Sequence, residues 1–270
     1  MHNPTTPTII TNFQLNRPHN PLWRKELWGG VVSARSWRIV IPALQTTRVD
    51  IIVTALKDLE TTFKTSLDQA GHTDDPYDLW ELSDLFPVPV VDDLLALEIG
   101  AGQMDYRIGR REINNDKRNY FDVERQASTP VVKSVAELFQ APETVANIEK
   151  KFGIDLTGTF LRIEYTQDRE SFWLEPHTDI GVKKFTMQIY LSRDEEAGGW
   201  GSSIYKDNQT FVRNVPFKSN CAIVFVPSPH SWHGFKPRPI NGTRKTLIVN
   251  YVTDKWRARE ELSFPATPVR

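Results

Sequence analysis

The stretch WLEPHTDIGVKKFTMQIYLS, residues 173–192, places a histidine two residues before an aspartate and just ahead of an alternating apolar run. In a β-strand, side chains two residues apart point to the same face, so His177 and Asp179 are expected side by side with Thr178 turned away. An imidazole and a carboxylate on one strand face can bind the same metal ion. We therefore predict that this stretch supplies two ligands of a metal site.

A third ligand is expected from a strand that lies beside the first one in the folded sheet. The stretch VPSPHSWHGFKP offers His230 and His233, and periodicity alone does not separate these two candidates. Two histidines and one carboxylate leave three positions open on an Fe(II) ion, which oxygen and a substrate can occupy. The residue types therefore predict a mononuclear iron site with open positions.

A possible anion-binding pair follows eleven residues beyond His233, where GTRKTLIVNYV presents Arg244 and Thr246 two residues apart. A guanidinium group binds a carboxylate through two parallel hydrogen bonds, and a hydroxyl group on the same strand face adds a further donor. The sequence thus predicts a carboxylate-binding group close to the metal.

The ordered set His177-x-Asp179, His233 and Arg244-x-Thr246 resembles the Fe(II)/2-oxoglutarate-dependent oxygenase superfamily. The surrounding sequence is most similar to the prolyl-hydroxylase-like branch. The similarity covers about residues 159–252 and includes, in the family's order, the segments LEPHTD, FTMQIYLS, GGWGSSIY, HGF and GTRKTLIVNYV. An HxD pair by itself is weak evidence, whereas the complete ordered set is specific.

The resemblance implies that His177, Asp179 and His233, not His230, are the metal ligands and the catalytic residues. It also implies Fe(II) and 2-oxoglutarate as cofactors, with O2 as co-substrate and with release of succinate and CO2. Family members that halogenate replace the carboxylate by Gly or Ala, so Asp179 favours hydroxylation of an unactivated carbon. Desaturation and ring formation use the same ligands and remain alternatives.

By the same resemblance, Arg244 holds the distal carboxylate of 2-oxoglutarate with the help of Thr246. Tyr190 and Tyr165 correspond to tyrosines that assist this binding in the family, and Tyr165 matches less closely. Some oxygenases use a lysine on the strand after HxD instead of the arginine. Lys184 is that alternative here, and the Arg244-x-Thr246 pair makes it unnecessary.

Three tryptophans, Trp173, Trp200 and Trp232, flank the motifs and predict a pocket for an apolar or planar group, although such residues commonly pack in a core. The basic stretch at residues 106–123 contains Arg118, which we assign to substrate binding; a solvated surface is the alternative. We expect a small metabolite, polar or anionic, as substrate, with a protein side chain as the second candidate.

A competing motif occurs in LLALEIGAGQMD, where Glu98, Gly100 and Gly102 resemble the first motif of class I methyltransferases. Asp122 and Glu124 stand at the distance expected for a ribose ligand. However, a third glycine is missing, and the segment that follows has no apolar helix face to pack on a sheet. An ordinary turn between a short strand and a polar loop is favoured over an S-adenosylmethionine site.

A second alternative is a non-redox, cupin-like metalloprotein that binds or isomerises a sugar. It would share the metal ligands and the sandwich fold. It would have no use for Arg244-x-Thr246 and would produce no succinate.

The elements that position these residues change in character along the chain. From residue 156 onward, short runs with period two alternate with Gly and Pro turns, which predicts an antiparallel sandwich or barrel. The expected fold is α+β or mainly β, a double-stranded β-helix (jelly-roll) core in the C-terminal half with supporting N-terminal helices. The expected regions, joined in one domain, are an extended arm at 1–22, a helical or mixed supporting region at 23–155, the jelly-roll oxygenase core at 156–254 and a tail at 255–270.

The supporting region has two helical patterns. Residues 46–71 show apolar side chains at the helical period, with Gly71 as the expected cap. Residues 130–153 predict a helix or a helix pair, broken at Pro142 and ended by Gly153. The acidic, Pro-containing stretch 72–93 is expected to be a connector.

Composition narrows the class of partner. The 270 residues contain 33 Lys and Arg against 34 Asp and Glu, so no overall field favours nucleic acid or an anionic membrane. No window approaches the roughly 18 apolar residues of a membrane span, and a single cysteine excludes an internal disulfide framework. We expect a cytoplasmic enzyme acting on a small molecule.

Overall fold

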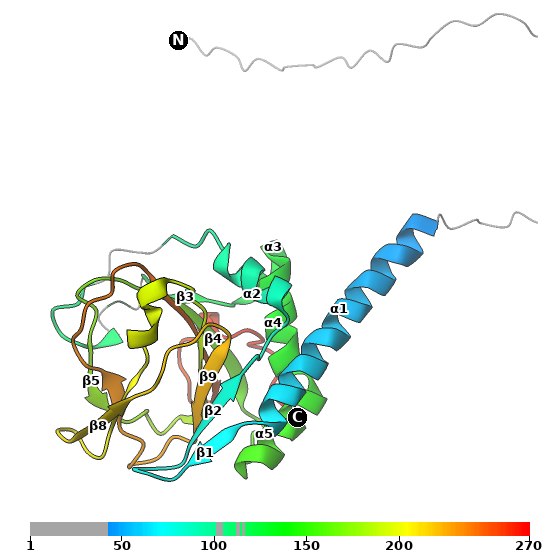
Figure 1. The fold of residues 1–270 in the computed structure, drawn as a ribbon. Helices are drawn as coiled ribbons and strands as arrows, with labels where there is room; N and C mark the ends of the chain where they lie inside the picture. The colour runs from blue at the N-terminus through cyan, green and yellow to red at the C-terminus, as the bar shows by residue number, and fades with distance from the viewer. Residues whose placement is uncertain (1–42, 101–104, 112–113, 115–116) are drawn as a thin grey trace, which may run out of the picture. The chain divides into compact units, whose positions relative to one another are not determined.

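Two antiparallel β-sheets form the centre of the protein (Figure 1). The computed structural model describes residues 43–100, 105–111, 114 and 117–270, with side chains from residue 56 onward. The predicted arm at residues 1–22 lies outside these ranges. Residues 43–270 form one compact unit.

The larger sheet has seven strands in the order β1-β2-β9-β6-β11-β4-β3. Their bounds are Gly71–Thr73 (β1), Leu79–Ser83 (β2), Asn119–Tyr120 (β3), Phe160–Asp168 (β4), Lys183–Tyr190 (β6), Cys221–Phe225 (β9) and Arg244–Val252 (β11). The smaller sheet has four strands in the order β5-β10-β7-β8. Their bounds are Leu174–His177 (β5), Ser203–Tyr205 (β7), Phe211–Asn214 (β8) and His233–Phe235 (β10).

The chain passes repeatedly between the two sheets from β4 to β11. Strands β4, β6, β9 and β11 belong to the larger sheet, and β5, β7, β8 and β10 belong to the smaller one. All of the pairings are antiparallel, and β11 lies between β4 and β6, in unbroken register with β4 and with one irregularity against β6 between Tyr251 and Val252. This topology is the predicted double-stranded β-helix, and the predicted fold class is confirmed. The parallel sheet that a class I methyltransferase requires is absent from the described residues.

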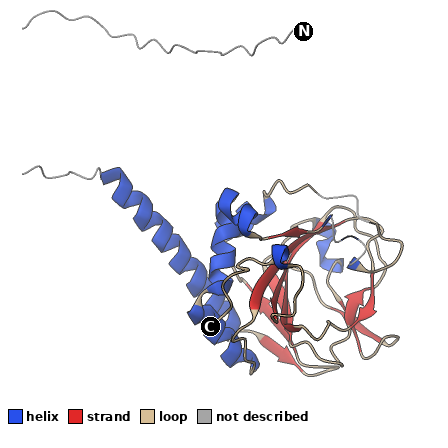
Figure 2. Cartoon of the chain, turned by 180° about the vertical axis from the view of Figure 1, so that it is seen from behind, coloured by secondary structure: helices blue, strands red, loops and turns tan. Residues whose placement is uncertain are grey.

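The larger sheet separates an apolar layer from a polar interior. One face packs against the helices, which gather on one side of the sheets in Figure 2. Its core includes Leu161, Ile163, Phe185, Met187, Leu247 and Val249 from the sheet and Leu59, Phe63, Val132, Val135 and Phe139 from the helices. The alternate residues of β4 are Arg162, Glu164, Thr166 and Asp168, all buried. Because successive strand residues point to opposite faces, these polar groups point toward the smaller sheet.

The helices largely follow the sequence patterns. Their bounds are Ala43–Asp68 (α1), Val88–Leu95 (α2), Val123–Ser128 (α3), Pro130–Gln140 (α4) and Pro142–Phe152 (α5). The predicted break lies between α4 and α5, and Gly153 ends α5 with a φ of 66°, a conformation that favours glycine. Helix α1 ends at Asp68, and Gly71 begins β1 instead of capping the helix. No helix among the described residues is long and apolar enough to cross a membrane.

The structure corrects two predictions in the N-terminal half. The expected connector at 72–93 contains parts of β1, all of β2 and the start of α2. Strand β2 pairs with β9, which lies far away in the sequence, so short-range periodicity gave little sign of it. The strand expected just before Gly100 is the end of α2 followed by irregular chain. Three strands of the larger sheet therefore precede residue 156.

Candidate metal centre and adjoining cavity

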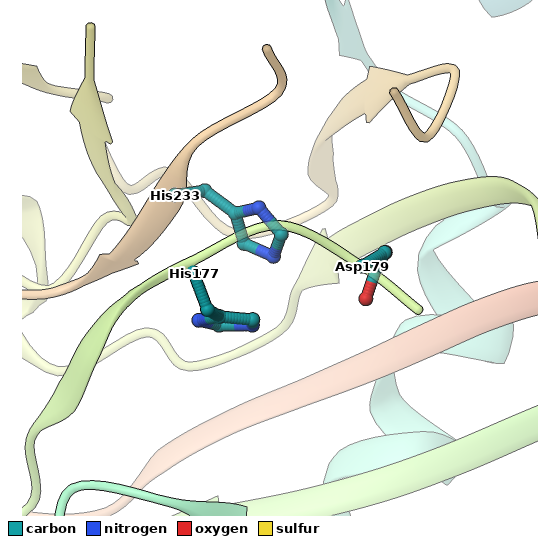
Figure 3. Close-up of side chains that lie close together, drawn as sticks. All are labelled: His177, Asp179 and His233. Carbon is teal, nitrogen blue, oxygen red and sulfur yellow. The ribbon is translucent and has the colours of Figure 1, made fainter. Parts of the chain in front are cut away.

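Three predicted ligands lie together at the end of the smaller sheet (Figure 3). His177 on β5 and His233 on β10 are direct partners in the antiparallel register, and their ring centroids are 4.4 Å apart. One potential ligand atom from each histidine and one from Asp179 lie within 4.8 Å of one another. They form the one such cluster of His, Cys, Asp or Glu that the described residues contain.

Asp179 reaches this cluster differently from the prediction. Strand β5 ends at His177, so Asp179 belongs to the loop that follows and not to the same strand. Its carboxylate is held by side chains of β6: Lys183 Nζ donates to Oδ1 at 2.5 Å and Thr186 Oγ1 donates to Oδ2 at 2.6 Å. Hydrogen bonds from β6, not strand alternation, therefore fix the position of this carboxylate.

Backbone carbonyl groups orient both imidazole rings. His177 Nδ1 lies 2.8 Å from the carbonyl oxygen of Glu175, and His233 Nδ1 lies 2.9 Å from that of Ser231. A carbonyl oxygen only accepts hydrogen bonds, so each Nδ1 carries a proton, and Nε2 of the neutral ring keeps its lone pair for a metal. Burial, together with the nearby His177, lowers the pKa of His233 to about 3, so this ring is neutral.

The charge of Asp179 suits a cation. Burial by itself would raise the pKa of Asp179, but the Lys183 ammonium, His233 and the two hydrogen bonds hold it well below its usual range. The carboxylate is therefore ionised. Two neutral imidazole nitrogens and one carboxylate oxygen are the donor set of non-haem Fe(II) sites that keep open positions.

The three side chains line a cavity of about 790 Å³. Binding sites for small organic ligands typically measure about 300–1,000 Å³. Polar residues of the larger sheet line it, namely Glu164, Thr186, Gln188, Arg244 and Asn250, together with apolar residues from both sheets and from the loop before β5, namely Phe172, Leu174, Phe225, Phe235 and Ile248. The cavity therefore has room for more than a metal and its immediate ligands.

Arg244 is the first residue of β11 and lines the same cavity with 1% of its surface exposed. Its Nη1 donates to Asp168 Oδ2 at 2.6 Å, and its Nε donates to the carbonyl oxygen of Trp200 at 2.7 Å. Asp168 is also its direct partner across strands β4 and β11. Arg111 donates to both carboxylate oxygens of Asp168, at 3.1 and 2.9 Å. The sequence pattern found Arg244 and included Arg111 only as one cation of the basic stretch at 106–123, and it gave no sign of Asp168, because the contacts among these residues depend on the tertiary structure.

Thr246 and Tyr190 lie next to Arg244 on the inner face of the larger sheet. They are partners across β11 and β6, and Thr246 shares a hydrogen bond of 2.6 Å with Thr166. The Tyr190 hydroxyl donates to Ser202 Oγ at 3.2 Å and accepts a hydrogen bond from the Ser202 amide at 3.2 Å. Both side chains are buried and neither lines the cavity; Tyr190 contacts the cavity wall through Ser202.

Tyr165 does not lie near the cavity, which corrects its predicted role. It is on the outer face of β4, stacked with Phe121, and its hydroxyl donates to the Leu94 carbonyl oxygen at 3.1 Å. The inner face of β4 carries the residues one position away, Glu164 and Thr166. A shift of one residue reverses the face of a strand side chain, and the sequence did not determine that phase.

The three predicted pocket tryptophans do not line the cavity. Trp173 packs against Gly109 and donates to the Tyr106 carbonyl oxygen at 2.8 Å, and Trp200 is buried in an apolar cluster. Trp232 is half-buried at the start of β10. Trp256, near the C-terminus, lines the cavity instead. Trp200 alone of the three is fully buried in the core, the alternative that the sequence had left open.

Arg118 lines the cavity, as its predicted role requires, but its charge is matched. Its Nε donates to Glu164 Oε1 at 2.9 Å, and its Nη2 bonds Oε2 of the same carboxylate. Arg162 donates to Glu164 at 3.3 Å and to Glu261 at 2.6 Å. The wall is therefore a network of ion pairs and not the open basic surface that the sequence suggested for an anionic substrate.

The remaining candidates lie away from the cavity. Lys184 and His230 are exposed. Asp122 caps helix α3 by accepting a hydrogen bond from the Arg125 amide at 2.8 Å, and Glu124 lies in the first turn of that helix. Gly102 lies outside the described residues. Asp122 and Glu124, which suggested a ribose ligand, therefore belong to the cap and first turn of helix α3.

Comparison with known proteins gives similarity of structure only. No protein-family model matches the chain, and no curated protein matches it. A prolyl 4-hydroxylase from Phytophthora capsici is 15% identical over 74% of this chain and 66% of that chain, just under two thirds of its length, with a TM-score of 0.49.

Two further solved structures have similar values. A Pseudomonas putida prolyl-4-hydroxylase is 13% identical over 72% of this chain and 94% of that chain, with a TM-score of 0.47. HygX from Streptomyces hygroscopicus, with nickel and 2-oxoglutarate bound, is 13% identical over 66% of this chain and 84% of that chain, with a TM-score of 0.43.

Proposed function

We propose that the protein is an Fe(II)- and 2-oxoglutarate-dependent dioxygenase that hydroxylates an unactivated carbon of a small polar metabolite, releasing succinate and CO2. The observation that carries this proposal is the joining of the metal cluster and the buried Arg244 by one cavity. A metal site alone would fit many proteins. A buried cation in the same cavity adds a place for the carboxylate of an organic acid.

The residues present fit the iron. His177 and His233 would bind it through Nε2, since each Nδ1 is engaged with a carbonyl oxygen. Asp179 would bind as an ionised carboxylate whose position Lys183 and Thr186 maintain. Iron with 2-oxoglutarate and O2 supplies the oxidising chemistry, and the protein supplies binding and orientation.

The cavity fits 2-oxoglutarate between the metal ligands and Arg244. Among the described residues, Arg244 Nη2 makes no hydrogen bond, so it can donate to a carboxylate. Gln188 and Ser202 offer polar groups along the wall, and Phe172, Phe225 and Phe235 restrict water on the apolar side.

The rest of the cavity favours a small polar substrate. Its walls combine the ion pairs of Glu164 and Glu261 with the indole of Trp256. A cavity lined by both polar and apolar residues suits a metabolite that carries both polar groups and carbon–hydrogen bonds. A carboxylate at position 179 favours hydroxylation, and we place the reaction in the cytoplasm because the single cysteine fits a reducing compartment.

Anaerobic titration of the purified protein with Fe(II) and then 2-oxoglutarate tests the proposal. A keto acid chelated to Fe(II) gives a weak visible charge-transfer band, which we expect in the wild type. Asp179→Ala is expected to lose or change this band, and Arg244→Ala is expected to need more 2-oxoglutarate to develop it.

Iron binding without a band at saturating 2-oxoglutarate would contradict the proposal and favour the cupin-like alternative. If the band forms, a product screen by mass spectrometry separates hydroxylation from desaturation or cyclisation, because a gain of one oxygen atom and a loss of two hydrogen atoms differ in mass.

A further inference from the structure

Two arginines share one carboxylate beside the cavity. Arg111 Nη2 and Arg244 Nη1 both donate to Asp168 Oδ2, at 2.9 and 2.6 Å. Arg111 comes from the segment before β3, whereas Asp168 and Arg244 are partners on β4 and β11. Both arginines line the cavity, and Asp168 lies behind them with its side chain 2% exposed. We call these three residues the Asp168 cluster.

The Asp168 cluster has an unbalanced charge. Two guanidinium groups against one carboxylate leave a net charge of +1 in a buried place. The next carboxylate, Glu164, lies 4.0 Å from Arg111, but Arg118 and Arg162 already bond it. A buried charge without a counter-ion costs free energy. An anion that enters the cavity and neutralises this charge is therefore expected to bind favourably.

A third cation adds to this imbalance. Arg238 donates to the carbonyl oxygens of Gly199, Gly201 and Lys236 and lies over the Phe235 ring, with 3.8 Å from the guanidinium carbon to the ring centroid. It makes no ion pair with a carboxylate among the described residues. Burial, with Arg244 nearby, lowers the pKa of Arg238 to about 10. The surroundings of Arg244 are thus electropositive beyond what one arginine provides.

Hydrogen-bond donors remain in the cluster for an incoming anion. Within the described part of the chain, Arg244 Nη2 and Arg111 Nε have no hydrogen-bond acceptor. The Phe172 ring lies beside both guanidinium groups, with 4.8 Å from the carbon of Arg111 and 5.9 Å from that of Arg244 to its centroid. This packing leaves little freedom for either group to turn away.

We propose that Arg111 and Asp168 belong to the co-substrate site, and that the distal carboxylate of 2-oxoglutarate completes the charge of the Asp168 cluster. Arg111 thereby adds a positioning residue from the N-terminal half to an anchor for which the sequence motif provides only Arg244 and Thr246. This inference rests on the proposed function, because it assumes that 2-oxoglutarate occupies the cavity.

The test compares two keto acids that differ only at the distal end. 2-Oxoglutarate and 2-oxopentanoate share the keto acid that chelates the metal, but 2-oxopentanoate lacks the distal carboxylate. Their dissociation constants would be measured by calorimetry on the Mn(II) protein and by the charge-transfer band of the Fe(II) protein without oxygen. Arg111→Gln is expected to weaken 2-oxoglutarate binding by about tenfold or more, as for a lost charged hydrogen bond. Binding of 2-oxopentanoate and of the metal should stay unchanged.

Three further variants separate charge from shape. Arg111→Lys keeps the charge and should recover most of the affinity lost in Arg111→Gln. Asp168→Asn keeps both guanidinium groups and makes the cluster more positive, so 2-oxoglutarate should bind as tightly as to the wild type or more tightly. Arg107→Gln is the matched control, because Arg107 lies in the same segment, pairs with Asp105 instead and does not line the cavity. It should bind both keto acids as the wild type does.

The possible outcomes are distinct. If the wild type binds no 2-oxoglutarate, the proposed function itself fails. If the wild type binds it and Arg111→Gln binds it equally well, or loses both keto acids equally, only the role of Arg111 is overturned. Equal weakening in Asp168→Asn and Arg111→Gln would also overturn charge completion, since it would show that the cluster merely shapes the wall.

Discussion

At the scale of single residues, the metal site depends on groups that orient the ligands as much as on the ligands themselves. Each histidine gives its Nδ1 hydrogen to a carbonyl oxygen two residues earlier in the chain. Asp179 stands outside any strand and depends on Lys183 and Thr186 of β6. Such supporting contacts usually change metal affinity by about 10- to 100-fold when removed.

Thr186→Val tests this support without replacing a ligand. The substitution keeps the shape of the side chain but removes the hydroxyl that donates to Asp179 Oδ2. We expect affinity for Mn(II) or Fe(II) to fall by about tenfold, measured by calorimetry without oxygen. Thr210→Val is the control, because Thr210 makes the same kind of bond to Asp207 in an exposed turn. Equal metal affinities in both variants would show that Asp179 does not depend on the Thr186 hydroxyl.

At the scale of elements, the two histidines meet because β5 and β10 approach each other closely. Gly234 follows His233 on β10, and a Cβ atom there would lie 2.7 Å from the Leu174 carbonyl oxygen and 3.0 Å from that of Glu175. Both oxygens belong to β5, and the second also orients His177. A residue without a side chain at this position therefore allows the pairing that aligns the ligands.

Gly234→Ala is expected to separate the strands and weaken metal binding, although position 234 bears no ligand. The added methyl group must push against backbone atoms of β5, which cannot move as freely as a side chain. We expect a lower Tm and a lower affinity for Mn(II), measured by thermal unfolding and calorimetry. Gly181→Ala is the control, since a Cβ at Gly181 meets nothing within 4 Å. Unchanged metal affinity in Gly234→Ala would show that the register of the histidines tolerates a wider strand spacing.

At the scale of the whole molecule, buried ion pairs connect parts of the chain that are far apart in sequence. Arg118 lies just before β3, Arg162 and Glu164 lie on β4, and Glu261 lies in a short 3-10 helix at Arg259–Glu261. Breaking a buried pair leaves an uncompensated charge and is strongly destabilising. The network therefore holds the C-terminal segment and the segment before β3 against the sheet around the cavity.

This network predicts acid-sensitive stability. Burial by itself would raise the pKa of Glu164, but Arg118 and Arg162 hold it below its usual value, which is about 4.3. A carboxylate with a lowered pKa in the folded state stabilises the protein above its unfolded-state pKa and loses that effect as the pH falls. Glu164→Gln should therefore lower the Tm most near neutral pH, and the difference from the wild type should shrink between about pH 5 and pH 3.

Glu137→Gln is the control for this experiment. Glu137 pairs with Lys133 on the exposed surface of α4, with side-chain exposures of 43% and 59%, and such pairs contribute little to stability. Its Tm should follow that of the wild type at every pH. A Glu164→Gln variant that differs from the wild type by the same amount at all pH values would argue against a lowered pKa of Glu164.

The sequence by itself determined those structural features that depend on nearby residues in the chain. Alternating strands, the break at Pro142 and the end of α5 at Gly153 follow from backbone preferences. The HxD pair, His233 and Arg244 could be found because their spacing along the chain is itself specific. These features were enough to predict the double-stranded β-helix and to identify the three candidate ligands.

Only the tertiary structure decided which side chains reach the cavity. Periodicity shows that alternate strand residues share a face but does not say which set points inward, so Tyr165 was assigned to the wrong side. The contacts of Trp256, Arg111 and Asp168 join segments that local patterns do not connect. Ion pairing also changed the chemistry, because strand register places Asp168 beside Arg244 and tertiary packing places Glu164 beside Arg118.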